Sequence, residues 1–350
     1  MTPRVSLVVV SFRSAAECAD AVESFRAEAA RAGAAAEVVI VDHSESAEEE
    51  TRLRRIAPDR LLVRANRGYA AGVNAGVAAS SAPTLLVGNP DIGFRPGSVA
   101  ALLRALDSGW AVVGPQFALA GFLFPPADVQ TPLEEVRRWR ASRSRAAWAR
   151  HFRRELARWR RVWDAAGPVS VPTLSGALLA MRRDVFERVG LWDEAYFLYF
   201  EETDWLRRLG AAGLRAAVVP GAVVAHRWAR AADPAEFAGV FEASRRRYLS
   251  RNFGVRGRLA AALPRGAEGV ELPPLPAPAP TVAAGDVLWL LSPSPLGFPA
   301  AGLRCGGPPP ADSVSEFLAQ HGRPQRLSLR AVDPGTGRIL GAWRCEPEGR

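Results

Sequence analysis

The sequence of 350 residues contains no lysine, only two methionines and only three cysteines. All 45 basic side chains are therefore arginines, and with 36 acidic residues they give a formal net charge of +9. Such a charge ordinarily indicates a polyanionic partner. Arginine and alanine are abundant together, however, which is typical of a GC-rich coding bias. We therefore predict no nucleic-acid partner, while a diphosphate ligand or an acidic lipid surface stays compatible with the charge.

The three cysteines, Cys18, Cys305 and Cys345, are far apart and show no C-x-x-C spacing. This pattern indicates neither a zinc site nor a disulfide framework, and it leaves open whether Cys305 and Cys345 are neighbours. The apolar run VSLVVVSF near the N-terminus is too short to span a membrane, and no small-residue cleavage site follows it. We therefore predict a cytoplasmic protein.

Five short runs rich in β-branched residues or leucine alternate with alanine-rich segments of helical length. The runs cover residues 4–11, 37–42, 60–64, 84–88 and 110–114. Continuous apolar strands that alternate with helices predict an α/β fold with a mostly parallel sheet covered on both faces. Ligands on such sheets bind beyond the carboxyl ends of the strands. The polar residues found at those ends are Ser11, Asp42, Asn66 and Asp91.

The chain divides at a proline-rich segment. We predict one α/β domain over residues 1–255, closed by a helix over roughly 235–251. The run LPPLPAPAPT is typical of a semi-rigid linker, which we place at residues 256–283. Beyond it, apolar runs and a turn at DPGTG predict a small β-rich module over residues 284–350.

A basic, tryptophan-rich insertion at residues 133–165 predicts one or two helices with an apolar stripe surrounded by arginine. The stripe consists of Trp148, Phe152, Leu156, Trp159 and Trp163. Two interpretations stay open. In one, the stripe packs on the main domain and the arginines are solvated. In the other, the insertion rests on anionic lipid at the inner face of the membrane, where tryptophan and arginine are both favoured.

Two further segments provide candidate ligand contacts. NRGYAAGVNAG, Asn66 to Gly76, matches neither a dinucleotide fingerprint nor a P-loop, but its evenly spaced glycines allow a ligand or a strand to approach one helix face. In VGNPDIGF, the proline before Asp91 restricts Asn89 to extended geometry and so fixes the carboxylate at the ligand edge. A divalent cation that bridges a diphosphate would bind there, and a simple turn aspartate is the competing interpretation.

Three carboxylates, Glu201, Glu202 and Asp204, directly follow an aromatic run in YFLYFEETDW. Acids in a first helical turn are favoured by the helix dipole, so all three could be structural. The alternative is that one of them is a catalytic base whose pKa the surrounding aromatic side chains raise by excluding water. These aromatic residues are Tyr196, Phe197, Tyr199, Phe200 and Trp205.

Between residues 4 and 250 the chain resembles glycosyltransferase family 2, in particular its bacterial rhamnosyltransferase-like branch. The resemblance is carried, in order, by VVVSFRS, VIVDHS, NRGYAAGVNAG, GNPDIGF, SGALLAMRRDVFERVGLWDEAYFLYFEETDW and VVPGAVVAH. The long fifth segment is highly specific. The resemblance implies a GT-A fold, a nucleotide-diphosphate sugar donor, Mg²⁺ or Mn²⁺ as cofactor, and inversion at the anomeric carbon.

The resemblance also implies roles for individual residues. Glu202 matches the family's catalytic base, Asp91 its metal- and diphosphate-binding acid, and His226 a histidine that completes the metal site. The nucleotide sugar would be bound by Ser11, Asp42, Asn66, Gly72, Asn74 and Asp91. Trp192, Asp193 and Glu201 would lie on the acceptor side.

The expected reaction transfers rhamnose or a similar sugar to a hydroxyl of a saccharide or lipid-linked saccharide in cell-surface polysaccharide synthesis. The sequence departs from the family pattern at His43, where asparagine is usual, at Asn89, the first position of an Asp-x-Asp, and at Glu202, where aspartate is commoner. A catalytically weak relic that only binds nucleotide sugar is one alternative. A nucleotidyltransferase is another, although SFRSAAE lacks the glycine-rich loop that would hold a triphosphate.

Overall fold

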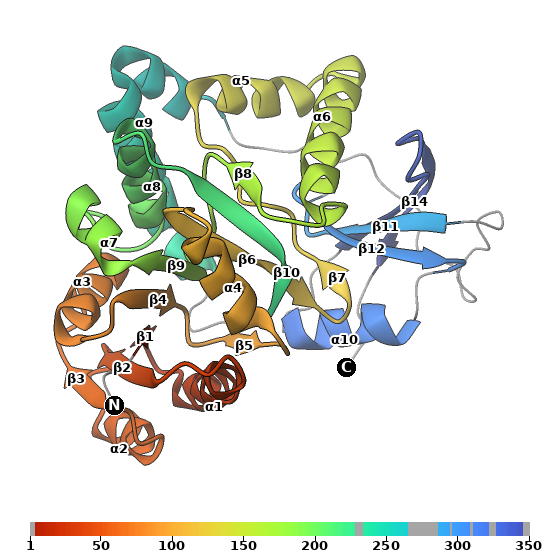
Figure 1. The fold of residues 1–350 in the computed structure, drawn as a ribbon. Helices are drawn as coiled ribbons and strands as arrows, with labels where there is room; N and C mark the ends of the chain where they lie inside the picture. Colours follow the sequence, from red (N-terminus) through yellow and green to blue (C-terminus); the bar gives the residue numbers. More distant parts are fainter. Residues whose placement is uncertain are drawn as a thin grey trace.

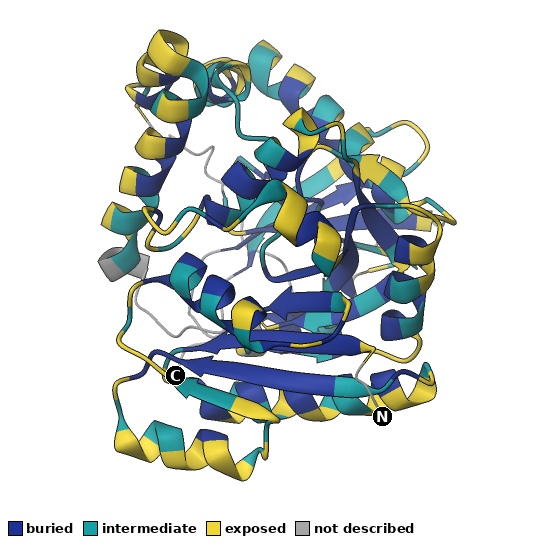
Figure 2. Ribbon diagram, turned by 60° about the vertical axis from the view of Figure 1, so that its left-hand side comes forward, coloured by how far each residue is buried: buried dark blue, intermediate teal, exposed yellow. Residues whose placement is uncertain are grey.

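The computed structural model describes residues 4–227, 234–264, 286–294, 296–308, 311–321 and 327–345. Within these residues the chain has an α/β fold built on one extended sheet (Figure 1). Figure 2 shows that the central strands are buried and that exposed residues lie mainly on the outer sides of the helices. The α/β class predicted from the sequence is therefore confirmed.

The N-terminal part of the sheet is parallel, as the sequence predicts. Its strands are β1 (Val5–Ser11), β2 (Ala36–Asp42), β3 (Arg60–Val63) and β4 (Thr84–Gly88), in the spatial order β3-β2-β1-β4. Helices α1 (Ala15–Arg31), α2 (Ala47–Arg55) and α3 (Tyr69–Ala79) connect them. Successive side chains of a strand point to opposite faces, so Leu7 joins the core with α1 while Val8 joins the core with α3. The carboxyl ends of these four strands meet at one edge.

Beyond β4 most strand pairs are antiparallel. β9 (Leu178–Arg182) lies between β4 and β6 (Val112–Leu119) and is antiparallel to both. β10 (Ala216–His226) is parallel to β6 and also pairs with β5 (Ile92–Phe94) and β8 (Val169–Val171). The helices of this part are α4 (Ser98–Asp107), α7 (Arg183–Val189) and α8 (Glu201–Ala211). Because His226 pairs with Ile92, it lies beside the loop that carries Asp91.

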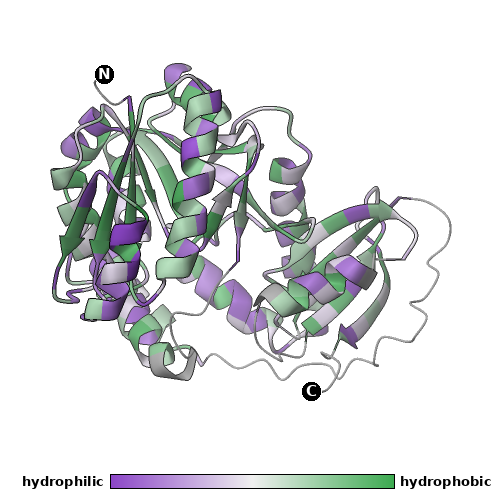
Figure 3. Ribbon diagram, turned by 90° about the horizontal axis from the view of Figure 1, so that it is seen from below, coloured by the Kyte–Doolittle hydropathy of each residue, from purple (hydrophilic) through white to green (hydrophobic). Residues whose placement is uncertain are grey.

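The C-terminal strands continue the same sheet. They are β11 (Asp286–Ser292), β12 (Ala301–Gly306), β13 (Leu327–Val332) and β14 (Ile339–Cys345), and β12 joins the main sheet through β7 (Phe122–Leu123). The turn expected at DPGTG is present, since the N–H of Gly337 donates to the carbonyl of Asp333. The module also contains α10 (Ala311–His321), which the sequence analysis did not predict. Figure 3 shows this part as a smaller lobe beside the larger one.

Cys305 and Cys345 are both free thiols. They belong to β12 and β14, which are separated by β11 and β13. Three strand spacings amount to about 14 Å, roughly twice the Cα separation that a disulfide allows. Cys305 and Cys345 are therefore not neighbours, because two strands lie between theirs.

The basic insertion forms two helices, α5 (Pro132–Ala141) and α6 (Arg145–Trp163). Its apolar stripe packs against the C-terminal module, where Phe152, Leu156 and Trp159 share a core cluster with Leu288 and Leu290. The packing interpretation is therefore right in that protein covers the stripe, but the main domain is not its only partner. The stripe does not face lipid, because Trp159 is fully buried, and its partner is the C-terminal module rather than the main domain alone. Two indole N–H groups add to this packing, since Trp148 donates to Leu296 O and Trp163 donates to Phe124 O.

The domain boundary predicted at residue 255 falls inside α9 (Pro234–Ala261), because the helix continues past residue 251. The backbone is non-helical only at Gly254, whose φ of 56° and ψ of −130° turn the chain. Residues 256–261 of the predicted linker are thus helical, and its residues 265–283 lie outside the described part of the chain. Among the described helices, none combines the length and apolar character needed to cross a membrane.

Candidate active site

Ser11 and Asp42 lie side by side at the carboxyl edge of the sheet, as residues paired in the β1–β2 register. Both are fully buried. One oxygen of Asp42, Oδ1, accepts the N–H of Ser44, while Oδ2 has no hydrogen-bond partner among the described residues. A buried carboxylate oxygen without a partner is costly, so a donor group of a ligand would be bound there. Because no solvent reaches Asp42, such a ligand would enter only after neighbouring side chains move.

The glycine-rich segment contributes mainly packing. A Cβ at Gly72 would lie 2.7 Å from Val10 Cγ1, so this glycine lets α3 approach β1 closely. Asn74 accepts the N–H of Trp192 on its Oδ1 and donates to the carbonyl of Trp192 from its Nδ2. Asn66 is only partly buried, and its side-chain oxygen accepts the N–H of Gly68. Nucleotide binding by Gly72 and Asn74 stays a prediction, since the protein itself already engages both.

Asp91 and His226, predicted as metal ligands, are brought together. Asp91 Oδ1 lies 3.3 Å from His226 Nε2, and both side chains are buried. Two neighbouring ligands of an octahedral ion, with bonds of about 2.1 Å, are separated by about 3 Å. The pair therefore fits a divalent cation as two adjacent ligands. The rings of Phe117 and Phe124, at centroid distances of 5.3 and 6.5 Å, hold the imidazole in place.

Glu202 lies in the first turn of α8 and is partly buried. It packs directly on the loop before β9, where a Cβ at Gly176 would stand 3.1 Å from Glu202 Cγ. Desolvation raises the pKa of Glu202, and backbone N–H groups of Glu202, Thr203 and Gly176 oppose this without cancelling it. A carboxylate with a raised pKa is a stronger base than an ordinary surface glutamate.

Asp91, His226 and Glu202 belong to one edge of the molecule. Ala177, which follows Gly176, accepts the N–H of Asn89 at 3.0 Å, and Asp91 is two residues further on. The Tyr69 phenol is close enough to both acid groups to feel their charges. Its pKa is raised mainly by burial and further by the negative charges of Glu201, Glu202 and Asp91. Its hydroxyl donates to Gly176 O at 3.4 Å. Tyr69 and Gly176 both lie in motifs quoted from the sequence, but nothing in the pattern singled them out.

Glu201 is more deeply buried than Glu202. It is 4% exposed, and its Oε2 has no hydrogen-bond partner among the described residues. Desolvation, followed by the charge of Glu202, raises the pKa of Glu201 well above its ordinary value. Two adjacent carboxyl groups in such a site do not ionise independently. Glu201 is the more buried of the two, and its pKa is the more strongly raised.

The turn before α8 is strained. Tyr199 and Phe200 have φ angles of 68° and 71°, and a bulky residue in this region costs about 1–3 kcal/mol. Helix α9 holds the turn, since Ser244 Oγ donates to Leu198 O and Phe200 packs on Phe241 at 5.3 Å. The turn sets the direction in which the first residues of α8, including Glu202, are presented.

The aromatic run does not surround the base as expected. Tyr196, Phe200 and Trp205 are buried in the protein core, whereas Phe197 and Tyr199 are 42% and 39% exposed. Only the last two are available to a sugar ring. The buried three pack with α9 or with the core beneath α8.

The predicted acceptor-side residues are largely occupied by the protein. Trp192 is 2% exposed and its ring packs near Tyr69. Asp193 pairs with Arg251 at 2.6 Å and accepts the N–H of Ala195. Asp204, the third acid of the motif, accepts from Arg208 Nε and Asn252 Nδ2 and is thus structural. Contact of these side chains with an acceptor stays a prediction.

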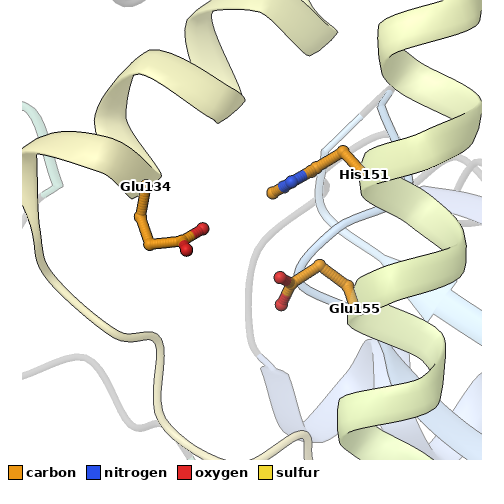
Figure 4. Close-up of side chains that lie close together, drawn as sticks. All are labelled: Glu134, His151 and Glu155. Atoms are coloured by element: carbon orange, nitrogen blue, oxygen red, sulfur yellow. The ribbon is translucent and has the colours of Figure 1, made fainter.

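A second group of metal-type side chains lies away from this edge. Glu134, His151 and Glu155 point toward one another between α5 and α6 (Figure 4), with ligand atoms within 4.8 Å of each other. The guanidinium of Arg154 already donates to all three. The neighbouring cavity has a volume of about 240 Å³, and its lining mixes acids with Arg138, Arg154 and Arg158. We interpret the group as an ion-pair network that joins the two helices.

Comparisons with known proteins agree with the sequence motifs. A profile of the family described as "Glycosyltransferase like family 2" matches residues 3–250. Two curated relatives, both N-acetylglucosaminyl-diphospho-decaprenol L-rhamnosyltransferases of Mycobacterium tuberculosis (strains CDC 1551 / Oshkosh and ATCC 25618 / H37Rv), are 34% identical over 204 residues. The match covers 53% of this chain and 65% of each relative.

A solved structure with a similar fold is a mannosyltransferase of Pyrobaculum calidifontis in complex with GDP-Man and Mn²⁺. The superposition covers 76% of this chain and 66% of that one, with 18% sequence identity and a TM-score of 0.46. At this level of similarity, the ligands of that protein carry no argument about the present one.

Proposed function

The chain belongs to the family described as "Glycosyltransferase like family 2", and on that premise we propose that it transfers a sugar from a nucleotide-diphosphate donor to an acceptor hydroxyl with inversion. The GT-A fold implied by the sequence agrees with the parallel β3-β2-β1-β4 sheet and its ligand edge. The observation that carries the proposal is the placement of Glu202, which is partly buried, has a raised pKa, and lies beside the loop that leads to Asp91.

In the proposed reaction, the Glu202 carboxylate accepts the proton of the acceptor hydroxyl. The oxygen then forms a bond to the anomeric carbon while the bond from that carbon to the nucleoside diphosphate breaks. The base must lie within about 3 Å of the hydroxyl for this transfer. Gly176 positions the carboxylate by packing directly on Glu202, and Tyr69 supports Gly176 by donating to its carbonyl.

Asp91 and His226 are the residues that would hold a divalent cation, Mg²⁺ or Mn²⁺. Such an ion supplies charge neutralisation for the departing diphosphate. The fit rests on the 3.3 Å separation of Asp91 Oδ1 and His226 Nε2. Asp42, with its unpartnered Oδ2, is the proposed contact for the base or ribose of the nucleotide.

The substrates are proposed by analogy. The curated relatives are named for transfer of L-rhamnose to an N-acetylglucosaminyl-diphospho-decaprenol acceptor. Because this chain spans about 65% of those relatives, we propose rhamnose or a similar sugar as the donor group and a saccharide, free or lipid-linked, as acceptor. We further propose that the reaction takes place in the cytoplasm and contributes to the synthesis of a cell-surface polysaccharide.

The test is a panel of nucleotide sugars incubated with the full chain, with consumption of each donor followed by mass spectrometry in Mn²⁺ and in EDTA. We expect one donor to be consumed in Mn²⁺ only. Calorimetry should show that Mn²⁺ tightens binding of the matching nucleoside diphosphate and that Asp91→Asn removes most of this effect. Diphosphate binding without consumption of any donor would indicate the binding-only relic instead.

A further inference from the structure

Most of the exposed large apolar side chains come from two segments that contact α8. Among the described residues, the large hydrophobic side chains that are most exposed are Val63, Leu133, Leu191, Phe197, Tyr199, Val255, Leu259 and Leu340. Five of these eight come from two neighbouring segments, the loop at residues 191–200 and the end of α9. Single exposed apolar residues need no explanation, but a group of them marks an interaction site.

The two segments are in direct contact. Arg251 on α9 pairs with Asp193 in the loop at 2.6 Å. The ring of Phe241, also on α9, packs on Tyr199 at 5.4 Å. The loop and α9 therefore lie side by side, and both contact α8.

The end of α9 folds back on the first part of the helix. A Cβ at Gly257 would lie 1.8 Å from the carbonyl oxygen of Leu249, so only glycine permits the close approach after the turn at Gly254. The fold-back is fixed by Arg245, whose Nη2 donates to Ala261 O at 2.7 Å. The inner residues are thereby buried, while Val255 and Leu259 remain 61% and 68% exposed.

This surface is also basic. Of the six arginines in residues 245–264, four are paired with Glu135, Glu242 or Asp193. Arg256 and Arg258, which alternate with the apolar pair, are exposed and make no ion pair with any described residue. Apolar side chains interleaved with uncompensated arginines fit the headgroup region of an anionic bilayer, which offers apolar burial and phosphate charge together.

We propose that the surface formed by Leu191, Phe197, Tyr199, Val255 and Leu259, with Arg256 and Arg258, docks on an anionic lipid bilayer. We call it the apolar–basic rim. The proposal rests on the proposed function in one respect, since a lipid-linked acceptor would be carried by such a bilayer. The lipid contact expected for α6 is thereby moved to α9 and the 191–200 loop.

The basic insertion does not compete for this role. Its apolar stripe is covered by the C-terminal module, and Arg154 and Arg158 are paired with Glu134, Glu155 and Asp128. Of the exposed large apolar side chains among the described residues, one, Leu133, lies in the insertion, and the nearby Arg137 is paired with Glu134. With a single exposed large apolar side chain, this surface would bind lipid more weakly than the rim, which has five.

The experiment is co-sedimentation of the full chain with phosphatidylglycerol-containing vesicles and with pure phosphatidylcholine vesicles. We expect binding to the anionic vesicles only, weakened at 0.5 M salt. The double substitution Val255→Glu with Leu259→Glu should lower the bound fraction by about tenfold, and Arg256→Glu with Arg258→Glu should do likewise. The matched controls are Leu340→Glu, another exposed apolar residue, and Arg150→Glu with Arg153→Glu on α6.

Two measurements keep the outcomes separate. Donor consumption in vesicle-free solution should be unchanged in the rim variants. A result against lipid binding therefore leaves the proposed sugar transfer untouched, and a result against sugar transfer leaves the lipid-binding test valid. Sedimentation velocity tests whether the rim instead joins two copies of the chain. Equal binding to both vesicle types, binding to neither, loss of binding only in the α6 variants, or loss of a dimer in the rim variants would each overturn the proposal.

Discussion

Gly176 and Glu202 are in contact across 25 intervening residues: a Cβ added at Gly176 would stand 3.1 Å from Cγ and 3.3 Å from Cδ of Glu202. The absence of a side chain at Gly176 thus sets the position of the proposed base.

Gly176→Ala should move the Glu202 carboxylate by a few tenths of an ångström. We expect turnover to fall by about tenfold, since small displacements of reacting groups are costly, with the affinity for the nucleoside diphosphate unchanged. Gly167→Ala is the matched control, because a Cβ there meets no atom within 4 Å. Equal turnover of both variants would show that Gly176 does not position the base.

Glu202→Gln should lower turnover by about a hundredfold or more while donor binding persists, because an amide cannot accept the proton. The exposed Glu187→Gln on α7 serves as control. The assignment fails if the Glu202 variant keeps near wild-type turnover.

The pH profile of turnover provides a separate check. Glu202 must be deprotonated to act as a base, and desolvation raises its pKa above the ordinary 4.5. Turnover should therefore decline on the acid side at a pH higher than that of an ordinary glutamate. The decline is measured with single-turnover rates between pH 4 and pH 8, with unfolding followed in parallel. An acid limb at or below pH 4.5 would contradict the raised pKa.

Glu201→Gln should stabilise the protein at neutral pH. The pKa of Glu201 is raised in the folded state, so the folded state binds more protons than the unfolded state, and stability is lost as pH rises above the unfolded value of about 4.3. Glutamine removes this loss. We expect Tm to increase at pH 7, by about 2–4 °C for each kcal/mol recovered, and the gain to vanish near pH 4. An equal gain in Tm at pH 4 and pH 7 would show that the raised pKa of Glu201 does not determine how stability depends on pH.

Trp159→Ala should reduce the free energy of unfolding by about 3–5 kcal/mol, since the side chain is fully buried between α6 and the C-terminal module. Urea unfolding measures the loss, and the exposed Arg153→Ala on the same helix is the control. A loss below about 1 kcal/mol would mean that the module does not depend on this contact.

Local pattern was sufficient to predict the parallel part of the sheet. β1, β2 and β4 are apolar runs bounded by helices, and parallel strands that end together necessarily place Ser11 and Asp42 side by side. Asp91 and His226 are 135 residues apart, and no spacing rule relates them. Their contact was expected only from the family resemblance, and the antiparallel pairing of β5 with β10 provides its physical cause.

Other features could not be predicted, because a sequence pattern identifies the apolar face of a helix but not the element that covers it. The stripe on α6 was recognised, but its cover comes from β11 and β13, more than 120 residues later. Asn74 has the composition of a ligand-binding residue, yet its amide is bound to the backbone of Trp192. The left-handed geometry of Tyr199 and Phe200 leaves no signal at all, since aromatic residues ordinarily avoid it.

The packing of α6 against β11 and β13 limits how this protein can be divided. The region that matches the family profile ends at residue 250, yet Phe152, Leu156 and Trp159 within it are covered by strands that begin at Asp286. An expression fragment cut after α9 would carry a bare aromatic stripe and would aggregate. Chimeras that exchange the transferase region between homologues will therefore stay in solution only when the tail is exchanged with it.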